Sequence, residues 1–283
     1  FHDVEGKLGY TWPGDWEGRT LLAIIMLSRA LKIYPEQLDD ILNHLPDHIC
    51  KNGHMGKPSE DGLINEQLLS GNSWFTRALC ELYEWKEDPK VLSKINDIVN
   101  GLILKAKSSY SLYPISKNER PIGIGAESGS LTGNITNGWL SSTDIGCAFI
   151  MIDGASHAYH ITKNQHLYSL LYEMINRFSQ ADLKGATFQT HATLSATRGI
   201  LRFYGDTGDK NLLELAEKTF NYYLSTATTE NYANYNWFGR PDWTEPCAIV
   251  DSYICAFELW KYTGKQNFLH NAHNIVYNAL YHS

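Results

Sequence analysis

Several features are absent from this 283-residue sequence, and each absence excludes a class of protein. There is no Lys/Arg-rich run and the net charge is -7, which argues against a nucleic-acid groove. No apolar run approaches the ~20 residues that cross a bilayer. A glycine-rich phosphate loop, a serine nucleophile elbow and an HExxH motif are also missing. We therefore expect neither nucleic-acid binding nor membrane insertion, and no nucleotide or serine-hydrolase chemistry.

Cysteine is scarce and widely spaced. Five are present, with no zinc-finger pairing, no adjacent Cys-Cys and no disulfide framework. Cys50, Cys80, Cys147 and Cys255 stand in apolar helical contexts and are predicted to be small core residues. Cys247 differs, because it follows a proline at the end of a long connection. The compartment stays open between cytoplasm and periplasm, and so does the oligomeric state.

Helical periodicity, in contrast, is abundant. Apolar residues recur at helical spacing in about ten segments, and the first, WEGRTLLAIIMLSRALKI, carries a broad apolar stripe with Asp15 as its predicted N-cap. The stretch 109–141 is rich in glycine, proline and serine, and is predicted to be a loop or a small β insertion. The other predicted helices cover residues 35–50, 65–86, 89–107, 142–162, 165–179, 190–205, 210–225, 246–262 and 266–281.

The helices are arranged as repeated hairpins. Each repeat has an apolar helix end, a polar turn and a second amphipathic helix, as in GILRFYGDTGDKNLLELA and CAFELWKYTGKQNFLHNA. Gly208 and Gly264 suit the helix ends, and Asp88-Pro89 suits a helix start. Such units must stack to bury their apolar faces. We predict a single all-α toroid over residues 1–283, with short turns on one rim and long connections on the other, where a site would form. Those connections are 51–64, 109–141, 180–189 and 226–245.

The connection TENYANYNWFGRPDWTEPC, residues 229–247, is the richest candidate for a site. Glu230 and Glu245 bracket it, and a carboxylate pair is what glycoside hydrolysis usually needs, although composition alone favours two solvated loop charges. Its aromatic rings suit the C–H faces of sugars, while some are expected only to pack the loop. These rings belong to Tyr232, Tyr235, Trp237, Phe238 and Trp243.

Glu245-Pro246-Cys247 is a sharper motif. A carboxylate and a thiolate both bind zinc, and a helix N-terminus favours the thiolate. Two ligands do not make a zinc site, however. The alternative is that Thr244 caps the helix and Cys247 is a core residue.

Polar residues also stand at two other predicted helix starts. His191 follows the 180–189 connection, and it either contacts a substrate or faces solvent. Asn65 and Asn72 belong to a polar helix start, together with Glu66 and Gln67, and they either bind hydroxyl groups or cap the helix.

These motifs resemble the bacterial β-L-arabinofuranosidase family, glycoside hydrolase family 127, and its close relatives. The resemblance covers nearly the whole chain, including GDWEGRTLLAI, NGHMGK and INEQLLSG, and it is most specific in the Glu-x-Cys helix start. It implies an (α/α)6 barrel and a retaining, exo-acting glycosidase. The substrate would be a carbohydrate such as a plant-type, arabinose-containing glycan.

The resemblance also implies roles for individual residues. Family members hold zinc with one Glu and three Cys, and Glu245 and Cys247 match two of these ligands. Glu230 matches the general acid/base, and His191 matches a histidine that contacts sugar hydroxyls. The other implied substrate contacts are Asn65, Asn72, Tyr232, Trp237 and Trp243.

The sequence departs from the family in three respects. The family's adjacent Cys-Cys pair, which contains the nucleophile, does not occur by Ser283, so we expect the nucleophile downstream. Ten helices fall short of the twelve in a closed barrel, so we expect an incomplete barrel. A family histidine appears as Asn65 or Asn72.

Two alternatives to this glycosidase stay open. One is another α/α-barrel enzyme, a hydrolase or lyase that acts on uronic-acid sugars, for which Arg240 is the only basic residue in the loop. The other is a non-catalytic, glycan-binding helical-repeat protein.

Overall fold

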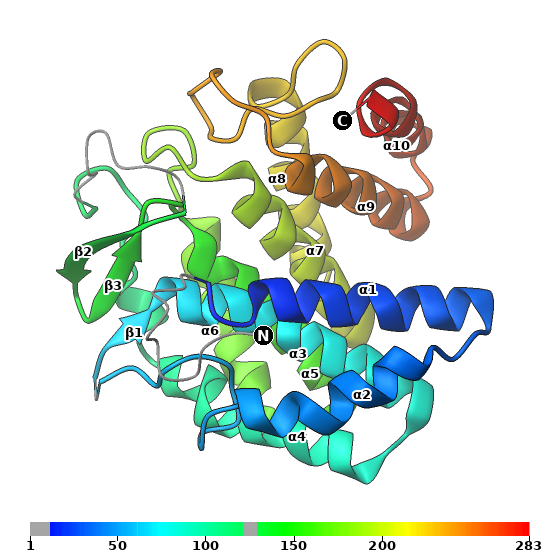
Figure 1. Ribbon diagram of the computed structural model, residues 1–283. Coiled ribbons are helices and arrows are strands. Elements are labelled where there is room, and N and C mark those ends of the chain that lie inside the picture. Colours follow the sequence, from blue (N-terminus) through cyan, green and yellow to red (C-terminus); the bar gives the residue numbers. More distant parts are fainter. Residues whose placement is uncertain (1–11, 61, 121–128, 283) are drawn as a thin grey trace.

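The computed structural model describes residues 12–60, 62–120 and 129–282. Five helical hairpins fill this part of the chain, and the fold is the predicted all-α toroid (Figure 1). The first helices of the hairpins form the inner layer: α1 (Asp15–Leu31), α3 (Glu66–Lys86), α5 (Met151–Thr162), α7 (Thr190–Thr207) and α9 (Pro246–Thr263). The second helices cover them: α2 (Glu36–His44), α4 (Pro89–Gly101), α6 (Gln165–Ser179), α8 (Lys210–Thr226) and α10 (Gln266–Asn278).

The inner helices form an arc with one open side. α1 packs on α3, α3 on α5, α5 on α7 and α7 on α9. α9 and α1, both within the described residues, do not pack along each other, and a cavity lies between them. The described residues therefore supply five hairpins, where a closed (α/α)6 ring has six.

The two rims of the toroid differ as predicted. Each hairpin closes with a short turn, at 32–35, 87–88, 163–164, 208–209 and 264–265. The connections between hairpins are long, and they bond to one another: Gln189 N donates to Ile145 O, and Phe238 N donates to Phe188 O. In Figure 1 the small sheet lies at the left with the starting ends of α1 and α9, while the turn between α1 and α2 lies at the far right.

The longest connection contains the small β element that the sequence predicted. β2 (Leu131–Thr136) and β3 (Trp139–Ser142) form a hairpin, and β1 (Ile64–Asn65) runs parallel to β3, which gives the order β1-β3-β2. Asn137 and Gly138 make the turn with φ of 51° and 82°, the conformation that a tight hairpin needs. A buried ion pair between Arg120 and Glu66, with two contacts of 2.7 Å, ties this insertion to the start of α3.

Three helices are shorter than the sequence predicted: α2 ends at His44 instead of residue 50, α4 ends at Gly101 instead of residue 107, and α5 begins at Met151 instead of residue 142. The predicted end and cap residues are confirmed except for Asp15. Gly208 and Gly264 end α7 and α9 at φ of 68° and 69°, and Asp88 caps α4 through its side chain. Asp15 is not the N-cap of α1, because Gly14 occupies that position. The Asp15 carboxylate instead pairs with Arg19 one turn later, at 2.6 Å.

The cysteine predictions are confirmed. Cys50, Cys80, Cys147 and Cys255 are buried, and Cys247 is half-buried at the start of α9. None of the helices in the described residues is both long enough and apolar enough to cross a membrane.

Glycines let the inner helices approach closely. A Cβ built on Gly199 of α7 would lie 2.5 Å from the backbone nitrogen of Asp153 on α5. A Cβ on Gly18 of α1 would lie 2.3 Å from the backbone nitrogen of Phe75 on α3. Both neighbours are helix backbone, which cannot move aside without moving the helix.

We predict that Gly199→Ala destabilises the protein by about 1–3 kcal/mol or more, because the added methyl group pushes α7 away from α5. Chemical denaturation measures this change. Gly208→Asn is the matched control at the end of the same helix, since that position is open and asparagine tolerates φ > 0. An unchanged unfolding midpoint in Gly199→Ala would contradict the tight contact.

Candidate functional site

The inner helices surround a central cavity of about 970 Å³. α1, α3, α7 and α9 supply most of its lining, which includes Arg19, Trp74, Arg198, Cys247 and Asp251. A second cavity, of about 1000 Å³, lies against α4 and the 49–65 connection, and Asn65 alone among the predicted site residues lines it. Cys247 is likewise the one predicted site residue that lines the central cavity, but this cavity is also lined by four arginines, Arg19, Arg77, Arg198 and Arg202, which makes it the better candidate for a site.

Three arginines surround a buried carboxylate beside this cavity. Asp153 of α5 accepts hydrogen bonds at Oδ2 from Arg77 of α3, at 2.6 Å, and from Arg198 of α7, at 2.5 and 3.0 Å. Arg202 reaches Oδ1 at 3.4 Å. Burial opposes ionisation of Asp153, but the arginine charges, Arg198 foremost, overcome it and hold the pKa of Asp153 well below its usual range.

The network continues to the loop end of the cavity. Arg198 Nη1 donates to Asp251 Oδ1 of α9 at 2.7 Å, and the other oxygen of Asp251 lies 2.6 Å from His191 Nδ1. His191 Nε2 lies 3.0 Å from Arg19 Nη2 of α1. Arginine can only donate, so Nε2 accepts from Arg19 and Nδ1 carries the proton that Asp251 receives. His191 is thereby held in place between a carboxylate and a guanidinium.

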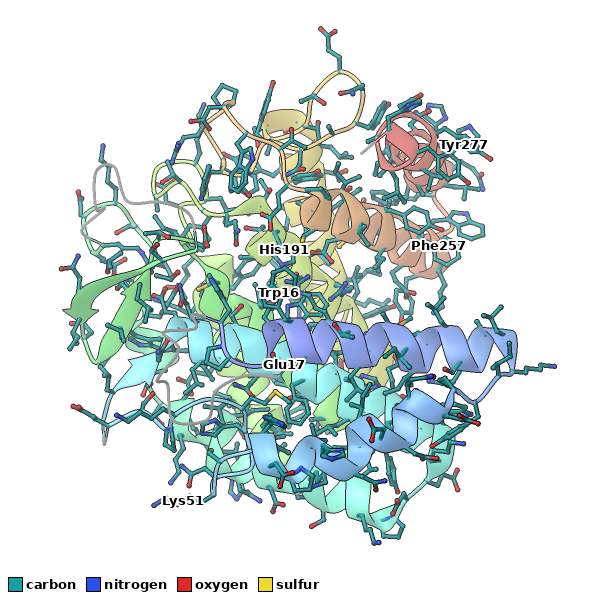
Figure 2. The ribbon with its side chains drawn as sticks, viewed as in Figure 1. Trp16, Glu17, Lys51, His191, Phe257 and Tyr277 are labelled. Atoms are coloured by element: carbon teal, nitrogen blue, oxygen red, sulfur yellow. The ribbon has the colours of Figure 1, made fainter. Side chains whose placement is uncertain are left out.

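Trp74 is packed inside this network. Its indole stacks parallel to the His191 ring, with centroids 5.9 Å apart. The guanidinium carbons of Arg19 and Arg198 lie 4.0 and 4.9 Å from its ring centroid. Trp74 therefore orients the charged groups. Figure 2 shows His191 at the start of α7, near the first turn of α1, where Trp16 stands with 76% of its surface exposed.

Glu245 and Cys247 lie at the start of α9 beside this network. Glu245 is the N-cap residue and Pro246 is the first residue of the helix, so Thr244 is not the cap. Glu245 Oε2 accepts from Gln189 Nε2 at 3.1 Å, and Arg19 Nη1 lies 3.9 Å from Cys247 Sγ. Burial raises the pKa of Cys247 to about 11; the charge of Arg19 opposes this, while Glu245 and Asp251 raise the pKa further. Cys247 is thus a neutral thiol at physiological pH.

Glu245 and Cys247 offer two side chains of the types that bind zinc. A structural zinc site has four protein ligands and a catalytic site has three. Within the described residues, no third histidine, cysteine or acid joins Glu245 and Cys247, and the Arg19 cation lies 3.9 Å from the sulfur. The residues present therefore do not form a zinc shell by themselves.

The remaining loop residues have different environments. Glu230 is exposed, at the first turn of the 227–245 connection. Trp237 is buried under Arg240, whose guanidinium lies 4.2 Å from its ring centroid, and Trp243 packs beside it with 50% of its surface exposed. Tyr232 bonds through its hydroxyl to Asn274 of α10. Of these rings, Trp243 leaves the most area free for a ligand.

The two asparagines fill structural positions. Asn65 caps α3, because its side-chain oxygen accepts from the backbone nitrogens of Gln67 and Leu68. Asn72 is fully buried, and its amide bonds to Met55 N, Met55 O, Pro13 O and Leu68 O. Asn72 therefore has no hydrogen-bonding capacity left for a sugar. Its role as a substrate contact remains a prediction that this geometry does not favour.

Sequence reasoning missed most of the charge network. Asp153, Asp251, Arg77 and Arg198 are four buried charges on inner helices, and none stands in a recognisable motif. The available signal was a charged residue inside an otherwise apolar helix, as in MIDGAS and AIVDSYICAF. Such residues are almost never buried unless they are paired.

One further cluster of possible metal ligands occurs among the described residues. Ligand atoms of Glu81, Glu84 and His157 lie within 4.8 Å of one another. Arg77 Nε donates to His157 Nδ1 at 3.0 Å, so His157 Nε2 carries the proton and donates it to Glu84 at 2.8 Å. Arg29 pairs with both glutamates. The cluster is already neutralised, and we assign it to structure.

Comparison with known proteins shows the fold and no family. No family model matches the chain, and no curated protein matches it in sequence. A cellobiose 2-epimerase from Bacillus thermoamylovorans B4167 is similar in structure, with a TM-score of 0.65 and 13% identity over 93% of this chain and 74% of that chain.

Two other solved structures are similar. An α-1,6-mannanase of Salegentibacter sp. HEL1_6, solved with α-1,6-mannotetrose, has a TM-score of 0.57 and 14% identity, over 83% of this chain and 68% of that one. A D-mannose isomerase has a TM-score of 0.59 and 11% identity, over 98% and 77%. At this identity the likeness establishes the α/α toroid alone, and glycoside hydrolase family 127 is not shown.

We predict that the protein loses stability as the pH falls below 6.5. Burial lowers the pKa of His157 from 6.5 to about 3, and the hydrogen bond from His157 lowers the pKa of Glu84 from 4.5 to about 2. In both cases the unfolded chain takes up a proton at a higher pH than the folded chain does, so acid favours unfolding. Urea midpoints at pH 7, 5.5 and 4 measure the effect.

His157→Gln isolates the histidine. Its midpoint should change less between pH 7 and 5 than that of the wild type, because only His157 of this pair titrates in that interval. Parallel pH profiles for the two proteins would contradict the buried neutral histidine.

Proposed function

We propose that this protein is a glycoside hydrolase that holds its sugar in the central cavity and reacts at the loop end. The observation that supports this most is the meeting of Glu245 and Cys247 with Arg19 and His191 beside the start of α9. A carboxyl group and a thiol next to a fixed cation offer acid–base and nucleophilic or metal-binding chemistry. The names of the similar structures, which are sugar enzymes, support a carbohydrate substrate.

The finer assignment follows the sequence resemblance: a retaining, exo-acting β-L-arabinofuranosidase. Arg19, held by Asp15 and His191, binds and orients the sugar, because a guanidinium keeps its charge and donates to ring and hydroxyl oxygens. Glu230 is the proposed general acid/base. It is exposed in this structure, so bound sugar would have to shield it from water.

Zinc is proposed for the full-length protein, with Glu245 and Cys247 as two ligands and two further thiolates completing the shell. When bound, zinc would keep the ligating thiols deprotonated at neutral pH. Because the pKa of Cys247 is raised, its thiol stays protonated at neutral pH unless a metal ion binds it.

We predict that Glu230→Gln slows hydrolysis of an alkyl β-L-arabinofuranoside by the full-length protein about 10²–10⁴-fold, the usual contribution of a general acid. Hydrolysis of the 4-nitrophenyl glycoside should fall less, because nitrophenolate leaves without a proton. Steady-state kinetics on both substrates measure the difference. Asp242→Asn, an exposed change in the same loop, is the control and should leave both rates unchanged.

Equal rates for wild type and Glu230→Gln on the alkyl glycoside would contradict this role.

A second function, proton transfer at a carbon next to a sugar carbonyl, is favoured by the fixed Asp251–His191 pair with Arg19 as the oxyanion partner. Deuterium incorporation at C2 of mannose or cellobiose in D2O, lost in His191→Asn, would identify that function instead.

We predict that the full-length protein purifies with about one zinc per chain, and that Cys247→Ser loses most of it. Elemental analysis after dialysis measures the content. Cys50→Ser is the control, because Cys50 lies outside the central cavity and should leave the zinc content unchanged. Metal-free wild type, or full zinc content in Cys247→Ser, would rule the metal assignment out.

A further inference from the structure

Arg202 on α7 is the cation of the central cavity that has no close partner within the described residues. The Asp153 carboxylate is occupied by Arg77 and Arg198 at 2.5–3.0 Å. Arg202 makes one contact with it, from Nε at 3.4 Å, and this is its sole ion pair in the described part of the chain. Its two terminal amino groups are therefore available for a ligand.

The other acids around the cavity form no ion pair with Arg202 in the described part of the chain, and each has a basic partner of its own. Asp206, one turn further along α7, accepts from Lys163 and His160 at 2.6 and 2.8 Å. Glu258 of α9 pairs with Lys261 at 3.3 Å. Glu81 and Glu84 pair with Arg29.

The position of Arg202 is accessible, and the cavity that it lines also has apolar residues on α9. The side chain is 27% exposed and lines the cavity, as do Tyr253, Ile254 and Phe257 on α9. Figure 2 shows Phe257 on α9, toward the far end of that helix from the loop side. A planar guanidinium in a cavity that also has aromatic and aliphatic side chains suits a ring with a carboxylate on one edge and C–H groups on its faces.

We propose that Arg202 binds the carboxylate of a uronic-acid residue in the central cavity. The inference rests on the proposed function in one respect, namely that the cavity takes carbohydrate. Arg202 lies eleven residues from His191 on α7, about 16 Å along the helix, so this sugar is a non-reacting unit of the glycan. The sequence offered only Arg240 in the loop as a basic partner for an acidic sugar. Arg202 is a second basic partner, and it lines the cavity.

Binding of free sugars to the purified protein tests the proposal without any need for catalysis. Isothermal titration with D-galacturonate and with D-galactose compares two ligands that differ at the carboxylate. Wild type should bind galacturonate at least about tenfold more tightly, as expected for a charge-assisted hydrogen bond. Arg202→Gln should lose this preference, and Arg202→Lys should keep part of it, because lysine retains the charge without the planar fork.

Arg240→Gln is the control, since Arg240 lies outside the cavity lining and is paired with Asp242. It should keep the full preference. Unfolding midpoints check that each variant is folded. If Arg202→Gln does not fold, the comparison is made with Arg202→Lys instead. Equal affinity for the two sugars, or an unchanged preference in Arg202→Gln, would overturn the subsite.

Three further outcomes separate the possible failures. Inorganic phosphate that competes as well as galacturonate would indicate a general anion site and overturn the uronic-acid assignment. A carboxylate preference in a protein that hydrolyses no arabinofuranoside would retain this subsite and refute the hydrolase. Binding of neither sugar would reject the subsite, while hydrolysis would still decide the proposed function separately.

Discussion

The need to neutralise one buried carboxylate, Asp153, governs how the inner helices of this toroid fit together. An unpaired carboxylate in a dry interior costs several kcal/mol, so Arg77 and Arg198 must stay in place around it. Arg198 also holds Asp251, and Asp251 holds His191, which receives a hydrogen bond from Arg19. Each of these side chains has the next one as its ion-pair or hydrogen-bond partner. The result is one connected network that joins α1, α3, α5, α7 and α9.

This network also explains why the candidate site is where it is. The short turns leave nothing at one rim to build a site, while the long connections converge at the other. Arg19, Trp74 and His191 are fixed there by partners deeper in the barrel, so a ligand at the loop end would meet groups that are already oriented. The side chains that hold the inner helices together are therefore connected directly to those proposed to meet the ligand. A change to the buried half of the network would be felt at the loop end as well.

The open side between α1 and α9 gives this cavity its mixed character. Arginines and acids line it from α3 and α7, while α9 contributes the apolar Ile254 and Phe257 as well as the charged Asp251, Glu258 and Lys261. Glu230, the predicted acid, lies outside this enclosure, exposed on its connection. Any acid–base role for it requires a bound sugar to complete the enclosure. The buried Asp251–His191 pair has no such requirement, and this favours proton transfer as the second candidate function.

The features that could be predicted from the sequence are those set by residues close together in the chain. Apolar periodicity, Pro89 after Asp88, and glycines at 208 and 264 specified ten helices and their hairpin pairing, because these signals act within a few residues. Glu245-x-Cys247 was visible for the same reason. The counter-charges of Asp153 and Asp251, the burial of Asn72 and the isolation of Arg202 were not visible. Each depends on which helices stand side by side, and that is set by packing between residues distant in the chain, so only the tertiary structure decided it.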